Sequence, residues 1–219
     1  MFGKKIRNKE IELYRKSTFL FNKKGYASTS IRQICREIGI RESSLYYYIS
    51  SKEEILYNIC ERSLLHGLKR MEPIAKLRLR ADLKLKKMIE THIQIITQTA
   101  DEQSTMLKEL RSLSVSNQRK IIKLRDRYQA LFRTGIAECI QEGLLPDMPV
   151  KITTFALLGM MNWMIHWYSP DGPMKSEDIA MAFSALFFQG LTRKNKKAGL
   201  KRTKPTVRSP RESSQAWEK

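Results

Sequence analysis

Two short helix-forming runs that meet at Gly39 constrain the fold of this 219-residue chain more than any other feature. Ser30 precedes the first run and Gln33 follows three residues later, which is the spacing of a capping box at a helix start. Apolar residues then recur at steps typical of one helix face: Ile31, Ile34, Cys35 and Ile38. Gly39 permits a left-handed turn, and residues 42–48 form the second run. The sequence therefore predicts a helix-turn-helix.

Helical patterns also cover the rest of the chain to about residue 191. Helix-forming residues dominate, only 7 prolines and 10 glycines occur, and no run of alternating β-branched residues indicates a strand. We expect Gly25 and Gly143 to end helices, Pro73 to stand just past one, and Ser176 to cap the last one. The expected fold is all-α with about nine helices, the others being residues 6–24, 52–72, 83–100, 103–114, 117–142, 149–168 and 176–191.

Positive charge is concentrated at the two ends of the chain. Residues 1–52 contain 12 Lys and Arg against 4 acidic residues, a net charge of +8, and residues 193–219 contain 10 against 2, again +8. Residues 53–192 carry only +3. Concentrated basic ends indicate a polyanionic partner, either nucleic acid or an anionic membrane surface. The tail from residue 193 is rich in Lys, Arg, Pro and Ser, and we expect it to be disordered.

Several features favour a cytoplasmic protein without a membrane span, metal or cofactor. Cys35, Cys60 and Cys139 lack paired spacing, which predicts buried, reduced thiols. The N-terminus has no signal-peptide apolar core. The apolar run 155–168 is shorter than the ~20 residues of a spanning helix. It also contains Asn162 and His166, so we interpret it as a buried helix or an oligomer interface. We find no catalytic motif, and we expect the chain not to be an enzyme.

The second helix of a helix-turn-helix enters the DNA major groove by its N-terminal residues. Ser43 and Ser44 are small hydroxyl donors at this position, and the tyrosines that follow can reach phosphates and sugars. Leu45 and Ile49 are spaced to face inward. Lys52 lies in the first turn of the next helix, where a phosphate is also favoured. The sequence therefore predicts double-stranded DNA as a partner.

The run GYASTSIRQICREIGIRESSLYYYISSKEEIL, residues 25–56, resembles the DNA-binding domain of the TetR family of bacterial transcriptional repressors. The matches include the glycines at 25 and 39 and the run from Ser44 to Tyr46. The resemblance implies a DNA-binding domain at residues 1–52, linked through helix 52–72 to a ligand-binding and dimerisation domain at residues 53–192. The implied DNA contacts are Thr29 or Ser30, Ser44, Tyr46, Tyr47, Tyr48 and Lys52. The position of Ser43 on the second helix adds that residue, and charge and position add Arg32 and Arg41.

Two positions depart from the family pattern. Arg41 stands where members commonly have Ser or Thr, which weakens the helix cap by ~1 kcal/mol at most. Glu42 stands where a basic residue is frequent. These departures leave the operator sequence open.

A repressor of this kind is a homodimer, because paired half-sites need two recognition helices. Helix 149–168 is apolar on nearly every face, and the helix after it is rich in Phe and Met. In the family, the last two helices commonly pack against their copies. The expected interface residues are Ile152, Leu158, Ile165, Phe183, Leu186 and Phe187.

The middle of the chain predicts a ligand pocket, although a methionine and aromatic stripe at helical spacing is also typical of an ordinary core. Residues 157–191 resemble the C-terminal part of TetR-family members that regulate fatty-acid and steroid breakdown and sense acyl-coenzyme A thioesters. The resemblance implies a small hydrophobic effector. The candidate ligand residues are Met88, His92, Arg125, Tyr128, Phe132, Phe155, Asn162, Trp163, His166 and Trp167.

Two alternatives remain open. One is a repressor of an efflux pump that senses cationic drugs, although the acidic residues of the middle region lie mostly on polar faces. The other is a basic protein of the membrane surface.

Overall fold

The computed structural model describes residues 2–190, with side chains from residue 9 onward, so the tail predicted at 193–219 lies outside the described residues. Within that part of the chain, nine α-helices and two short 3-10 helices form and no strand does, which confirms the all-α prediction. The helices are α1 Phe2–Lys24, α2 Ile31–Ile38, α3 Glu42–Leu45, α4 Lys52–Ala75, α5 Ala81–Gln98, α6 Ala100–Glu109, α7 Val115–Gln141, α8 Val150–Asn162 and α9 Ser176–Gln189.

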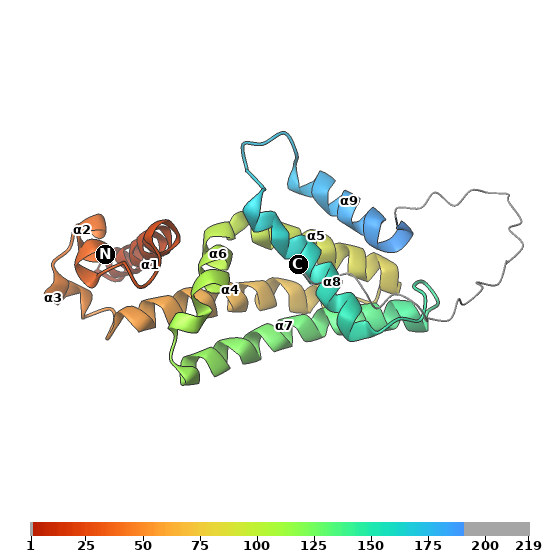
Figure 1. Cartoon of the computed structure of the whole chain (residues 1–219), viewed down its shortest axis with the longest axis horizontal. Helices are drawn as coiled ribbons and strands as arrows, with labels where there is room; N and C mark the ends of the chain where they lie inside the picture. The colour runs from red at the N-terminus through yellow and green to blue at the C-terminus, as the bar shows by residue number, and fades with distance from the viewer. Residues whose placement is uncertain (1, 191–219) are drawn as a thin grey trace, which may run out of the picture.

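Helix α4 connects the two parts of the molecule (Figure 1). Helices α1, α2 and α3 gather at one end, and α4 runs from there into a larger bundle with α5 and α7. Ile55, Leu56 and Ile59 of α4 are buried in the core of the small end, whereas Leu68 and Met71 are buried in the core of the bundle. A single continuous helix therefore contributes to both cores.

The local signals at α2 are confirmed. Ser30 Oγ accepts a hydrogen bond from the backbone N–H of Gln33 at 3.2 Å, and Gln33 Oε1 accepts one from the backbone N–H of Ser30 at 2.9 Å. The two bonds satisfy amides that a helix start otherwise leaves free. Gly39 has φ 66° and ends the helix in the left-handed region. The turn between α2 and α3 is thus specified by residues 30–39.

Three predicted helix boundaries were wrong. The helix expected at 42–48 ends at Leu45 and continues as a turn. Pro73 lies inside the last turn of α4, because a proline near a helix end removes only one hydrogen bond. Ser176 is the first residue of α9, and the residue in the cap position is Lys175.

The helix predicted at 149–168 is not continuous. It ends at Asn162, and a 3-10 helix covers Trp163–His166. A 3-10 helix turns about 120° per residue against about 100° in an α-helix, so side chains beyond Asn162 leave the face that an unbroken helix gives them. The predicted ligand residues beyond Asn162 therefore do not share one helix face with it.

No helix in residues 2–190 is long and apolar enough to cross a membrane. The three cysteines are buried and unpaired, as the sequence predicted.

Candidate functional site

The turn around α3 presents hydroxyl and phenol groups to solvent on a buried support. Tyr47 is 89% exposed and Tyr46 is 56% exposed. Ser43 is also exposed, whereas Leu45 and Ile49 are 0% and 3% exposed and anchor the segment, as predicted. We call residues 42–48, which are α3 and the turn after it, the tip of α3. Its polar side chains are available to an external partner, because Leu45 and Ile49 hold the segment in place.

The remaining candidates near the tip differ in exposure. Arg32 and Arg41 are exposed, and Ser44 and Tyr48 are half-buried. Arg32 Nε lies 3.9 Å from Glu42 Oε1, so one acidic side chain stands among the basic ones. Arg41 occupies the cap position of α3 and makes no side-chain capping bond. The start of α3 therefore keeps its backbone amides free of side-chain caps.

Thr29 and Lys52 contact the protein itself. Thr29 is 1% exposed, and its hydroxyl donates to the carbonyl of Gly25 at 2.8 Å. Lys52 Nζ donates to the carbonyls of Tyr26 and Thr29, both at 2.8 Å, and lies 4.2 Å from the centre of the Tyr26 ring. Burial lowers the pKa of the Lys52 ammonium. Both residues brace the segment before α2, and the Ser30 hydroxyl caps α2.

A cavity of about 80 Å³ lies in the bundle between α4, α5, α6, α7 and the α8 end. His92, Arg125, Tyr128 and Asn162 line it, so the structure brings four of the predicted ligand residues together. Leu158 and Ile165, which the sequence analysis predicted at the dimer interface, also line this cavity. The other lining residues are Ser63, Leu64, Gly67, Ile95, Gln103, Met106, Leu107 and Gln129.

A hydrogen-bonded triad forms one wall of the cavity. His92 Nδ1 lies 2.8 Å from Tyr128 Oη, and His92 Nε2 lies 3.2 Å from Asn162 Oδ1. Burial lowers the pKa of His92 to about 4, so its imidazole is neutral at pH 7. Because the amide oxygen of Asn162 can only accept, Nε2 carries the proton and Nδ1 accepts from the Tyr128 hydroxyl. The amide hydrogens of Asn162 remain available to a guest.

Arg125 gives the cavity a positive, donor-rich character. Its Nε is buried and has no hydrogen-bond partner among the described residues. In the part of the chain that the structure describes, no carboxylate lies within 4.0 Å of an Arg125 nitrogen. No Asp or Glu among residues 9–190 lines the cavity either. An anion or an uncharged hydrogen-bond acceptor suits such a site better than a cation does.

The other predicted ligand residues do not reach the cavity. Met88 and Phe132 are 0% exposed and pack behind it, with the Phe132 ring 5.5 Å from that of His92. Phe155, Trp163 and Trp167 are 46%, 62% and 46% exposed on the outer surface. His166 is also exposed and its ring lies 4.3 Å from that of Trp163, because the 3-10 segment turns it away from Asn162.

Gly67 is a lining residue that the sequence analysis missed. A Cβ atom at this position would lie 3.1 Å from Cε2 of Tyr128, so the glycine permits the tyrosine ring to pack directly on α4. Glycine in a helix interior costs about 1 kcal/mol relative to alanine, and its presence inside an otherwise regular helix was the available signal of a close approach.

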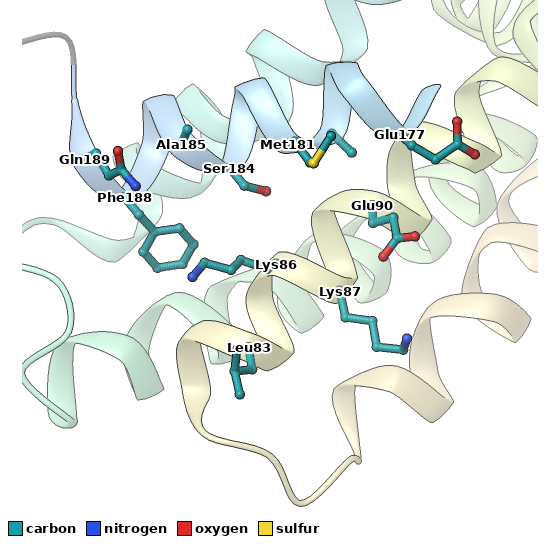
Figure 2. A pocket seen from close by; sticks show the side chains of 11 residues that line it. Leu83, Lys86, Lys87, Glu90, Glu177, Met181, Ser184, Ala185, Phe188 and Gln189 are labelled. Atoms are coloured by element: carbon teal, nitrogen blue, oxygen red, sulfur yellow. The ribbon is translucent and has the colours of Figure 1, made fainter. Parts of the chain in front are cut away.

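A second hollow is more open and lies between α5 and α9 (Figure 2). Its volume is about 620 Å³. Lys86 extends toward the Phe188 ring, 5.1 Å from its centre. Lys86 and Lys87 are balanced by two lining glutamates, Glu90 and Glu177, so the charge of this hollow favours neither sign of guest.

Large apolar side chains are exposed on the last helices. Ile152 and Phe155 of α8 are 64% and 46% exposed, and Trp163 continues this series at 62%. Met181 and Leu186 of α9 are 64% and 40% exposed, and Phe183 and Phe187 are half-buried. Exposed apolar surface of this kind marks an interaction site.

Comparisons with known proteins cover most of the chain. Residues 15–59 match the family model of bacterial regulatory proteins of the tetR family, and residues 79–191 match that of the tetracyclin repressor-like C-terminal domain.

The chain is 24% identical to the HTH-type transcriptional repressor KstR2 of Mycolicibacterium smegmatis, over 83% of this chain and 89% of the relative. Among solved structures, the TetR family transcriptional regulator PfmR from Thermus thermophilus is 32% identical, with a TM-score of 0.77 over 83% of this chain and 99% of that one. AibR in complex with isovaleryl coenzyme A and operator DNA is 21% identical, with a TM-score of 0.75 over 82% and 98%.

Proposed function

Because the chain belongs to the TetR family of bacterial regulatory proteins, we propose that it is a transcriptional repressor that binds operator DNA as a homodimer and is released by a small hydrophobic effector of the acyl-CoA class. The observation that carries this proposal is the exposed serine and tyrosine tip of α3 on its buried Leu45 and Ile49 support. In this proposal residues 1–52 bind DNA, residues 53–192 bind the effector and dimerise, and the protein works in the cytoplasm.

The DNA contacts we propose lie on the exposed side of the helix-turn-helix. Ser43, Tyr46 and Tyr47 reach the major groove, and Arg32 and Arg41 contact its edges. Ser44 and Tyr48 contribute their exposed portions. Thr29, Ser30 and Lys52 form hydrogen bonds within the protein, and Ser30, which is exposed, can also contact a phosphate.

Dimerisation supplies the second recognition helix. Ile152, Phe155, Trp163 and Leu186 offer exposed apolar surface that a second copy of α8 and α9 would cover. Two half-sites about one helical turn apart, roughly 34–36 Å, are then read together. Replacing Phe155 with Glu should convert the dimer into monomers in light scattering, whereas replacing the exposed Leu65 of α4 should not.

The cavity is the proposed effector site. An acyl thioester combines an apolar chain with a carbonyl acceptor, which matches apolar walls that carry the donors of Arg125 and Asn162. Occupation of the cavity favours a protomer arrangement in which the two recognition helices no longer match successive major grooves. DNA affinity then falls by the differential affinity of the effector for the two states.

Selection from a pool of random duplexes tests the DNA-binding function without a known operator. The purified protein should enrich a two-fold symmetric motif at about 0.2 M salt, where non-specific phosphate binding is weak. The Tyr47→Ala variant should enrich much less. Equal recovery of all sequences by the native protein would contradict the proposal, and binding to anionic vesicles in its place would favour the membrane-surface alternative.

The efflux-pump alternative differs in the charge of its effector. A site for cationic drugs needs acidic partners, and none of the described residues that line the cavity is acidic. A thermal-shift screen with acyl-CoA thioesters, free fatty acids and cationic dyes separates the two functions. Stabilisation by dyes alone would replace the acyl effector with a cationic one.

A further inference from the structure

We infer that the part of the effector that the protein buries is a short acyl group of about four to six carbons, whose carbonyl oxygen is bound by the donors of Arg125 and Asn162. This inference rests on the proposed function and narrows its effector class. Four observations carry it: the volume of the cavity, the fixed position of its walls, the unpartnered nitrogen of Arg125, and the location of its opening.

The volume limits the guest. A cavity of about 80 Å³ is well above the roughly 10–15 Å³ that one water molecule needs, so it holds a guest of several non-hydrogen atoms. An acyl group of four to six carbons, counted with its oxygen and sulfur atoms, is a small guest of this kind. Pockets for larger ligands usually have about 300–1,000 Å³. A sixteen-carbon chain or a steroid ring system therefore exceeds the space by a wide margin.

The walls of the cavity are packed in a way that resists enlargement. Leu64, Ile95 and Leu158 are buried in packed helices on different sides of it. The Tyr128 ring lies against the backbone of Gly67 and is tied to His92 by its hydroxyl. Enlarging the cavity in that direction requires breaking a buried hydrogen bond, which costs about 1–3 kcal/mol.

The unpartnered hydrogen-bond donors of the cavity indicate that the polar end of the guest is a hydrogen-bond acceptor. Arg125 Nε is buried without an acceptor, a state that an incoming carbonyl oxygen relieves. His92 is neutral and engaged through both ring nitrogens, so it offers the guest no charge. The amide hydrogens of Asn162 supply a second donor. Among the residues whose side chains the structure describes, no acidic one lines the cavity to balance a positive guest.

The opening leaves room for the rest of a thioester. Leu107 is 54% exposed, and among the lining residues it alone falls in the exposed class. Leu107 belongs to α6, and Gln103 of the same helix and Gln129 of α7 are half-exposed lining residues. A coenzyme A moiety, too large for the cavity, would leave beside Leu107 and remain in solvent.

A chain-length series tests the inference. CoA thioesters of 2, 4, 5, 8, 12 and 16 carbons, with free CoA as a blank, are titrated against the protein alone and against its complex with the selected duplex. Thermal stabilisation and DNA release should both peak at four to six carbons and be at least tenfold weaker at sixteen. Release by long chains at equal or lower concentration overturns the inference while the proposed function stands. Absence of release by every thioester overturns both the inference and the acyl effector, but not the DNA binding.

Two leucine variants relate the optimum to the cavity. Leu158→Ala widens the cavity and should move the best chain length up by two or more carbons. Leu145→Ala removes a similarly buried leucine that packs in the same core without lining the cavity, and it should leave the optimum unchanged. Identical profiles for both variants would contradict the assignment, even where both lose stability.

Arg125→Met tests the carbonyl contact. The variant keeps most of the side-chain volume but has no guanidinium, and short thioesters should bind it 10- to 100-fold more weakly. Arg119→Met, at an exposed position of the same helix, should change binding less than twofold. Native affinity in Arg125→Met would exclude the contact.

Discussion

The two functional regions at α4 place their polar groups in opposite environments. At its N-terminal end, the tip of α3 holds phenols and hydroxyls in solvent, with Tyr47 89% exposed. Farther along the helix, next to Gly67, the cavity buries His92 and Tyr128 and half-buries Asn162, and the His92 ring is hydrogen-bonded to both of the others. The exposed groups of the tip contribute little to folding stability and are free to bind a partner. The buried groups of the cavity contribute to folding stability even without a bound ligand. Variants of the tip should therefore change DNA binding alone, and variants of the cavity should change both folding and effector response.

The largest effect is expected at the tip. The double variant Tyr46→Ala/Tyr47→Ala should bind the selected duplex about 100-fold more weakly, because two groove contacts of about 1–3 kcal/mol each are removed. Its urea unfolding midpoint should match that of the native protein, since both rings are mostly in solvent. Fluorescence anisotropy measures the affinity. A large loss of stability in this variant would remove the contrast between the two regions.

The burial of His92 in the cavity should make the stability of the protein depend on pH. The ordinary pKa of histidine is about 6.5, whereas that of His92 is about 4 in the folded protein. Between these values the unfolded chain binds more protons, so stability is fully present above pH 6.5 and falls as the pH falls toward 4. The expected loss between pH 7 and pH 5 is about 2 kcal/mol.

Urea unfolding at the two pH values measures this loss. His92→Gln should lose about 2 kcal/mol less than the native protein on going from pH 7 to pH 5. His66→Gln, at an exposed position of α4, should keep the native difference. An equal pH dependence in the native protein and His92→Gln would mean that the imidazole is not held neutral in the fold.

Lys52 tests the comparison in a different way. It lies at the start of α4, in the DNA-binding part of the protein, but its ammonium group is hydrogen-bonded to backbone carbonyls of the protein itself. Lys52→Met removes two hydrogen bonds from a charged group to the carbonyls of Tyr26 and Thr29, and should lower stability by roughly 1–2 kcal/mol. The slope of log affinity against log salt should stay unchanged. If Lys52 instead bound a phosphate of the duplex, its replacement would reduce that slope by about one.

The smallest effect concerns the cap of α3. Arg41 makes no capping bond, so Arg41→Ser should stabilise the protein by about 0.5 kcal/mol. The DNA affinity of this variant should fall if Arg41 contacts the duplex. Urea unfolding and anisotropy on the same sample compare the two effects directly.

The sequence predicted the first region better than the second. Ser30, Gln33 and Gly39 specify α2 and its turn through bonds within ten residues, so a local pattern is enough to predict them. The inward bonds of Lys52 cross 23 and 26 residues and left no local signal. Asn162 and His166 were the polar residues singled out in an apolar run, and of these two Asn162 lines the cavity whereas His166 does not. The break at Asn162 could not be read from an apolar run, and it moved Trp163, His166 and Trp167 outside.

Linkage between the two regions is the central claim, and reciprocal titration tests it most directly. The affinity for the selected duplex is measured with and without a saturating short-chain CoA thioester, and the thioester affinity is measured with and without the duplex. The account predicts that each ligand weakens the other by the same factor, of about 5- to 150-fold. An unchanged DNA affinity at saturating thioester would contradict the account.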